Sequence, residues 1–153
     1  MKVLLSYICV LSVYRCIHSD EKECSDNLIY AHIDNSTSLD FIRDNLLALG
    51  KTLSDRLKTI PVGGGQRFLE DFKLYNNNMK IFLELAKEDP ESSKPDVKSI
   101  LYQKNYTHVI ETDFCEEDMV DNFNWNQTNI RQFYKVRDTL NGIWIDLHFV
   151  EWT

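Results

Sequence analysis

Residues 39–86, LDFIRDNLLALGKTLSDRLKTIPVGGGQRFLEDFKLYNNNMKIFLELA, carry two apolar stripes that predict how the chain folds. Spacings of three and four residues place one apolar side chain per turn on the same side of a helix. The first stripe comprises Leu39, Ile42, Leu46, Leu49, Leu53, Leu57 and Ile60. Gly50 interrupts it and costs a helix about 1 kcal/mol relative to Ala. Because the stripe continues past Gly50, we predict one helix from about Ser38 to Ile60.

The second stripe predicts a second helix of similar length. It comprises Phe68, Phe72, Tyr75, Met79, Phe82 and Ala86. This helix should end near Asp89 and Pro90, because Pro disfavours helical geometry in the preceding residue. Residues 59–65, with three consecutive glycines, read as a short flexible connector. Two helices joined in this way form an antiparallel helical hairpin.

The second half of the chain leaves alternatives open. Residues 89–95 read as a polar loop between two prolines, and the β-branched residues 106–112 are compatible with a strand. At the C-terminus, one helical stripe is complete. It comprises Ile130, Phe133, Val136, Leu140, Ile143, Leu147 and Val150. Alternatively, Asn141-Gly142 starts a hairpin whose strand alternates from Ile143 to Phe149, or Gly142 is the left-handed cap of a helix ending at Leu140.

We favour a mainly α fold, a helical bundle built on the antiparallel helical hairpin. The first half is firmly helical by pattern, and the late stripe is long. The alternative is an α+β fold, in which the two N-terminal helices pack on a small antiparallel sheet.

The N-terminus predicts export from the cell. Residues 1–19 combine Lys2, a short apolar run and an end at Ile17-His18-Ser19, as in a secretory signal peptide. The apolar run is shorter than the roughly 20 residues that cross a bilayer, so we expect no membrane insertion. Residues 20–153 would then form a single secreted, extracellular domain. Three Asn-x-Ser/Thr sequons predict glycosylation at Asn35, Asn105 and Asn126.

Export also sets the expected state of the cysteines. Cys9 and Cys16 would leave with the signal peptide, so that Cys24 and Cys115 remain. In an oxidising compartment two cysteines most simply form one internal disulfide. Because this disulfide would close a long loop, the chain-entropy model predicts that it stabilises the fold by roughly 4 kcal/mol.

Charge and motifs narrow the classes of function. The net charge is −7, and losing Lys2 and Arg15 brings it to −9. An acidic surface disfavours nucleic acid and anionic membranes. The sequence holds no His-Glu-x-x-His, Cys-x-x-Cys, Gly-x-Ser-x-Gly, P-loop or EF-hand pattern. We therefore predict no cofactor, no metal site, no catalytic residues and no enzymatic activity.

Aromatic residues gather in the last third of the chain, where most of them suit a core. Trp125 lies among Asn residues and fits a core least well, so we predict it as an exposed binding anchor together with Tyr134. A glycan at Asn126 would shield Trp125.

These features predict a protein that binds proteins, as an extracellular ligand or modulator of an extracellular or cell-surface partner. Its size, signal peptide, sequons and single disulfide are similar to those of short-chain helical cytokines, in architecture only. Those cytokines have an up-up-down-down bundle with long crossovers, for which the connector at residues 61–65 is too short. The alternative function is an extracellular carrier of a small apolar ligand or lipid.

Overall fold

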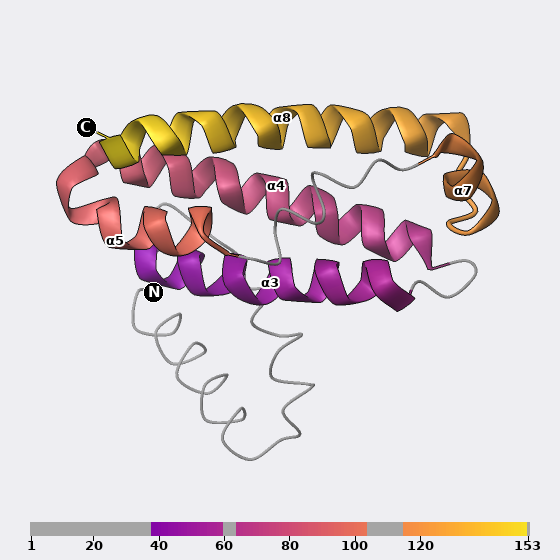
Figure 1. Cartoon of the computed structure of the whole chain (residues 1–153), viewed down its shortest axis with the longest axis horizontal. Helices are drawn as coiled ribbons and strands as arrows, with labels where there is room; N and C mark the ends of the chain where they lie inside the picture. Colours follow the sequence, from indigo (N-terminus) through magenta and orange to yellow (C-terminus); the bar gives the residue numbers. More distant parts are fainter. Residues whose placement is uncertain (1–37, 60–63, 104–114, 153) are drawn as a thin grey trace, which may run out of the picture. The chain divides into compact units, whose positions relative to one another are not determined.

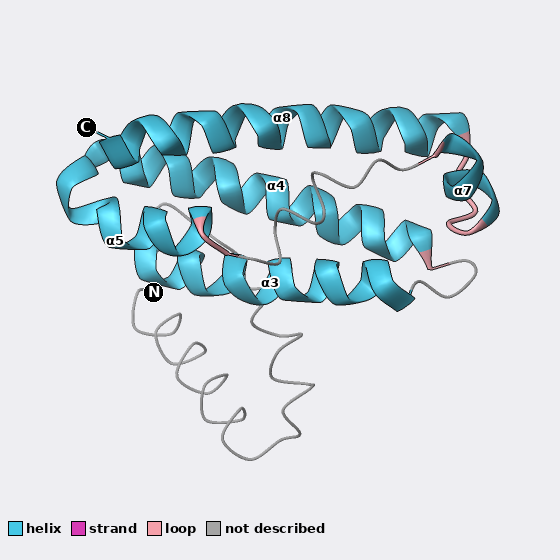
Figure 2. Ribbon diagram, viewed as in Figure 1, coloured by secondary structure: helices cyan, strands magenta, loops and turns pink. Residues whose placement is uncertain are grey.

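A computed structural model describes residues 38–59, 64–103 and 115–152 of the chain, and within them every regular element is a helix (Figures 1 and 2). The helices are α3 (Leu39–Thr59), α4 (Gly65–Glu88), α5 (Pro90–Leu101), α7 (Glu116–Asp121) and α8 (Gln127–Trp152). The predicted mainly α bundle is confirmed, and the alternative with a sheet is not supported. Residues 106–112, considered above as a strand, lie outside the described ranges.

Four helices pack in a ring. α3 contacts α4 and α5, and α8 contacts α4 and α5 in turn. Figure 1 shows α3 and α4 as an antiparallel hairpin. α4 and α8 run in the same direction, because Lys73 Nζ donates to Gln132 Oε1 (2.6 Å) and Lys87 Nζ to Asp146 Oδ2 (3.0 Å) at equal sequence offsets. Helix directions therefore alternate along the chain, unlike the up-up-down-down order of short-chain helical cytokines.

The apolar stripe of α4 lies entirely inside the bundle. All six of its side chains are fully buried: Phe68, Phe72, Tyr75, Met79, Phe82 and Ala86. From α3 they meet Ile42, Leu46, Leu49 and Leu53, which are equally buried. Burying a large apolar side chain contributes about 1.5–3 kcal/mol, so this shared core supplies much of the stability.

A buried ion pair fastens the hairpin near its connector. The Asp71 carboxylate of α4 is almost completely buried and bonds to Nη1 of Arg56 on α3. Arg67 Nε lies 3.5 Å from the other carboxylate oxygen. A buried charge is costly unless it is paired, so these contacts to arginine allow the Asp71 carboxylate to lie inside the bundle.

The predicted loop at residues 89–95 is wrong, because this segment opens α5. Asp89 is its N-cap, and the Asp89 side chain accepts a hydrogen bond from the Ser92 backbone N–H (3.2 Å). Pro90 occupies the first helical position, where a missing N–H costs nothing. The same proline that ends α4 therefore starts α5.

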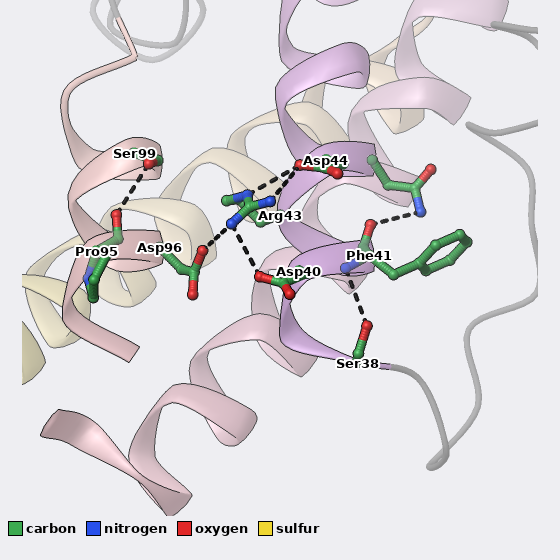
Figure 3. Close-up of polar contacts among 9 residues, drawn as sticks. Ser38, Asp40, Phe41, Arg43, Asp44, Pro95, Asp96 and Ser99 are labelled. Carbon is green, nitrogen blue, oxygen red and sulfur yellow. Dashed lines mark hydrogen bonds and ion pairs between the residues drawn. The ribbon is translucent and has the colours of Figure 1, made fainter. Parts of the chain in front are cut away.

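A cluster of one arginine and three aspartates joins α5 to α3. Arg43 of α3 bonds to Asp40 (3.0 Å) and Asp44 (2.9 Å) on its own helix and to Asp96 on α5 (Figure 3). Its bonds with Asp44 and Asp96 raise the pKa of Arg43, which stays charged. Gln103 Nε2 adds a hydrogen bond to the Leu47 carbonyl, 3.0 Å long, beside Gly50.

α8 is one continuous helix, as the long stripe predicts. Gly142 lies in its middle, so the hairpin at Asn141-Gly142 and the left-handed cap are both wrong. Asn126 caps the helix, and its Oδ1 accepts hydrogen bonds from the backbone N–H groups of Thr128 (2.9 Å) and Asn129 (3.0 Å). Tertiary packing of an apolar face outweighs the modest cost of one glycine.

The first residue of α4 is held in close packing rather than in a flexible connector. Residues 60–63 lie outside the described ranges, but Gly65 is buried. A Cβ atom at Gly65 would collide with the Phe123 backbone oxygen and would lie 2.7 Å from Trp125 Nε1. Because Gly65 has no side chain, the turn between α7 and α8 packs directly against the N-terminus of α4.

The two glycines Gly65 and Gly142 make a matched pair of test sites. A Cβ at Gly142 meets no atom within 4 Å. Gly142→Ala should therefore raise the free energy of unfolding by about 0.4–1 kcal/mol. Gly65→Ala should lower it by about 1–3 kcal/mol, since the backbone of Phe123 must move. Urea unfolding of both variants checks this, and equal effects of the two substitutions would contradict the packing at Gly65.

Candidate protein-binding face

Trp125 does not lie on the surface, so the prediction that it is an exposed anchor is wrong. It is 3% exposed, and its ring lies 4.9 Å from Phe123 and 5.4 Å from Phe133, measured between centroids. Asn124, between Phe123 and Trp125, has a left-handed backbone (φ 53°), a conformation that Asn tolerates. This kink turns both aromatic side chains inward, although polar residues surround them in sequence.

The aromatic cluster around Trp125 closes one end of the bundle. Phe68 and Phe72 of α4 stack at 6.0 Å, and Phe72 stacks on Phe133 of α8 at 5.2 Å. Trp125 Nε1 is buried beside Gly65 and has no hydrogen-bond partner among the described residues. The cluster is a structural core between α4 and α8, and it leaves little of Trp125 for a partner to touch.

Tyr134 lies half-exposed on α8, and its role in binding stays a prediction. Its ring meets Phe133 edge-on at 5.7 Å between centroids. The Arg137 guanidinium lies 4.9 Å from the centre of the Tyr134 ring. This cation–π contact holds the phenol in place on the helix surface.

The exposed apolar residues of α8 lie elsewhere than the sequence suggests. Ile145 is 56% exposed, Phe149 69% and Trp152 84%. Their spacing of four and three residues puts them on one side of the helix, and we name this set the outer stripe. Ile143, Leu147 and Val150 are buried on the opposite side. The second half of α8 is thus apolar on both sides.

Polar groups frame the outer stripe. His148 Nδ1 lies 3.6 Å from Glu151 Oε2, and Trp144 meets the His148 ring edge-on at 6.0 Å. Tyr102, at the end of α5, hydrogen-bonds to Glu151 Oε1 (3.2 Å), which raises the pKa of Tyr102. An apolar centre with a polar surround is the usual composition of a protein-binding surface.

Sequence reasoning missed the outer stripe because it considered residues 143–149 as a strand or as one face of a helix. The strand option groups Ile145 with Leu147, which α8 places on opposite sides. The helix option follows the buried stripe alone. The signal was present in the spacing of Ile145, Phe149 and Trp152, which forms a second stripe once the helix is accepted.

The remaining predicted sites are only partly described. Asn126 is exposed at the start of α8, and Cys115 is exposed just before α7 and forms no disulfide with another described residue. Asn35, Asn105 and Cys24 lie outside the described ranges, so the disulfide and these two glycans stay predictions. None of the described helices is long and apolar enough to span a membrane.

The described part of the chain shows no arrangement of His, Cys, Asp and Glu side chains that would hold a metal ion. An open depression of about 330 Å³ lies at α7, lined by Glu116, Glu117, Val120, Asp121 and Gln127. Its four polar residues, three of them acidic, give an apolar ligand little to bind.

Searches of protein-family models, curated proteins and solved structures find no match to this chain.

Substitution of Trp125 and of Trp152 tests directly whether the first side chain is buried and the second exposed. Trp125→Ala should lower the free energy of unfolding by about 3–5 kcal/mol, as for other buried aromatic side chains. The same substitution at Trp152 should change it by less than about 0.5 kcal/mol, because the side chain lies in solvent. Denaturant unfolding measures both, and a small effect at Trp125 would mean that its indole is not part of the core.

Proposed function

We propose that this protein is a secreted, extracellular glycoprotein that acts by binding another protein, as a ligand or modulator. The observation that carries the proposal is the outer stripe of α8. Three large apolar side chains on one helix face are each more than half exposed. Scattered exposed apolar residues need no explanation, but a contiguous set with a polar frame is typical of an interaction site.

Export and glycosylation rest on the sequence. The signal-like residues 1–19 and the three sequons support a route through the secretory pathway. Asn126 is well suited to modification, because it is exposed and caps α8 through Oδ1, whereas a glycan would be attached at Nδ2. A glycan there would stand at the opposite end of α8 from the outer stripe, leaving the stripe open.

The outer stripe suits a partner that presents an apolar groove or helix face. Aromatic anchors bury large rigid surfaces at little entropy cost and dominate binding energy where they occur. Trp152, with the highest exposed fraction among the described large apolar residues, is the strongest anchor available. The acidic depression at α7 gives the alternative, a carrier of small apolar ligands, no support.

The test is binding of the secreted, glycosylated protein to a displayed panel of cell-surface and secreted proteins. We expect Trp152→Gln and Phe149→Gln to weaken binding to the identified partner at least about 30-fold, the size of a hot-spot loss. Thermal unfolding should be nearly unchanged. Val120→Gln, which removes an exposed apolar side chain of α7, is the control and should bind normally.

Two outcomes would contradict this binding surface. One is a partner that both α8 variants bind as tightly as the unchanged protein. The other is loss of binding that accompanies unfolding, which would make the outer stripe part of the structure rather than a contact face.

Asn126 allows glycosylation to be separated from helix capping. Asn126→Asp keeps the side-chain oxygen that caps α8 but removes the glycan acceptor, so the protein from a eukaryotic host should lose one glycan mass and keep its stability. Asn126→Ala should lose the glycan and about 1 kcal/mol of stability. Intact mass before and after enzymatic deglycosylation gives the readout. An unmodified Asn126 in the unchanged protein would refute this site.

A further inference from the structure

The exposed side of α8 extends well beyond the outer stripe. Eighteen residues make five full turns, so Tyr134 lies on the same line of the helix as Trp152. Asp138 and Asn141 fall within about 40° of this line and Arg131 within about 60°, and all three are exposed. We name the set from Arg131 to Trp152 on this side the outer face of α8. It is polar in its first half, which carries the cation Arg131 and the anion Asp138, and apolar in its second half.

We propose that the outer face of α8 pairs with the same face of a second copy of this chain, with the two helices antiparallel. The proposal rests on the proposed function, in which the outer stripe binds a protein, and it names the partner. Most soluble homo-oligomers are two-fold dimers in which one self-complementary patch meets itself. The question is therefore whether the two halves of the face complement each other.

A two-fold axis beside Asn141 and Gly142 pairs residues at equal distances from it along α8. Arg131 of one copy then faces Trp152 of the other, and Tyr134 faces Phe149. A guanidinium over an indole is a favourable cation–π contact, and aromatic pairs add to apolar burial. In a parallel pair the cationic Arg131 and the anionic Asp138 would each face their own copies instead. The antiparallel arrangement avoids both like-charge contacts, although it places Asp138 of one copy opposite Ile145 of the other, and we favour it on that ground.

The middle of the face allows the two helices to approach. Gly142 carries no side chain, and the space where its Cβ would lie is open to 4 Å. Asn141 beside it is exposed and short. The bulky residues stand on either side of this point, where each meets the opposite half of the second copy.

The area that a stable dimer must bury is a second reason to expect that the whole outer face takes part. An aromatic side chain buries about 150–250 Å², so even complete burial of Tyr134, Phe149 and Trp152 would supply roughly 450–750 Å² of the ~800 Å² that each partner of a standard interface buries. The rest must come from the polar residues between Arg131 and Asn141. Only a pairing along the full length of the face includes them.

The experiment is sedimentation equilibrium of the full secreted chain over a wide concentration range. We expect a reversible monomer–dimer equilibrium in which Trp152→Gln and Arg131→Glu each raise the dissociation constant at least 10-fold. Lys80→Glu makes the same charge change at an exposed site on α4 and should leave the dissociation constant unchanged. Added salt should strengthen the dimer, because each copy carries a charge of about −7 to −9 whose repulsion salt screens.

Cysteine cross-linking tests the antiparallel direction. Gly142→Cys lies beside the axis and should give a disulfide-linked dimer, identified by peptide mapping. Ile145→Cys should not, because the two copies of this position stand about 10 Å apart along the helices, beyond disulfide reach. Equal cross-linking of both variants would indicate parallel helices and overturn the arrangement.

The remaining outcomes separate this inference from the proposed function. A chain that stays monomeric at every concentration overturns the dimer. If Trp152→Gln then still abolishes binding to a different protein, the proposed function stands with a heterologous partner. A dimer that is indifferent to both Trp152→Gln and Arg131→Glu uses another surface, and the inference is wrong.

Discussion

The buried stripe of α4 is the surface against which the other long helices pack. Its six core side chains are fully buried between α3 and α8, and the carboxylate of Asp71 ties the same helix to Arg56. Gly65 extends this role to the end of the bundle, because the absence of a side chain there lets Phe123 and Trp125 close over Phe68. α3, α8 and the turn before α8 therefore take their positions from α4.

The composition of α8 differs from that of a simple amphipathic helix, because both its inner and its outer side carry apolar residues. Its inner side contributes Phe133, Leu140 and Leu147 to the core that α4 organises. Its outer side exposes more than half of each of the side chains of Ile145, Phe149 and Trp152. A helix that packs on one side has one apolar face, so the second apolar face is the feature on which the proposed binding function rests.

The hairpin could be predicted from sequence because its signal is local and repeated: six side chains of α4 at regular spacing, bounded by Gly65 and Pro90. Three features could not. Pro90 reads as a break, and only the Asp89 cap shows that it also begins a helix. Asn141-Gly142 suits a turn in isolation, and packing of the flanking helix overrides that preference. Trp125 looks exposed among Asn residues, because its burial depends on the backbone of Asn124 and on the space left by Gly65, which is distant in sequence.

The central claim is that the aromatic residues around the start of α8 are buried while those at its C-terminal end are exposed, and hydroxyl-radical footprinting of the monomeric protein measures this most directly. Radical oxidation of a side chain follows its solvent exposure, and mass spectrometry reads each aromatic residue in the same sample. Trp152 and Phe149 should react at nearly the rate of the unfolded chain, while Trp125 and Phe133 are protected. Reaction of Trp125 as fast as Trp152, or protection of Trp152 in the monomer, would contradict both the fold of α8 and the binding face assigned to it.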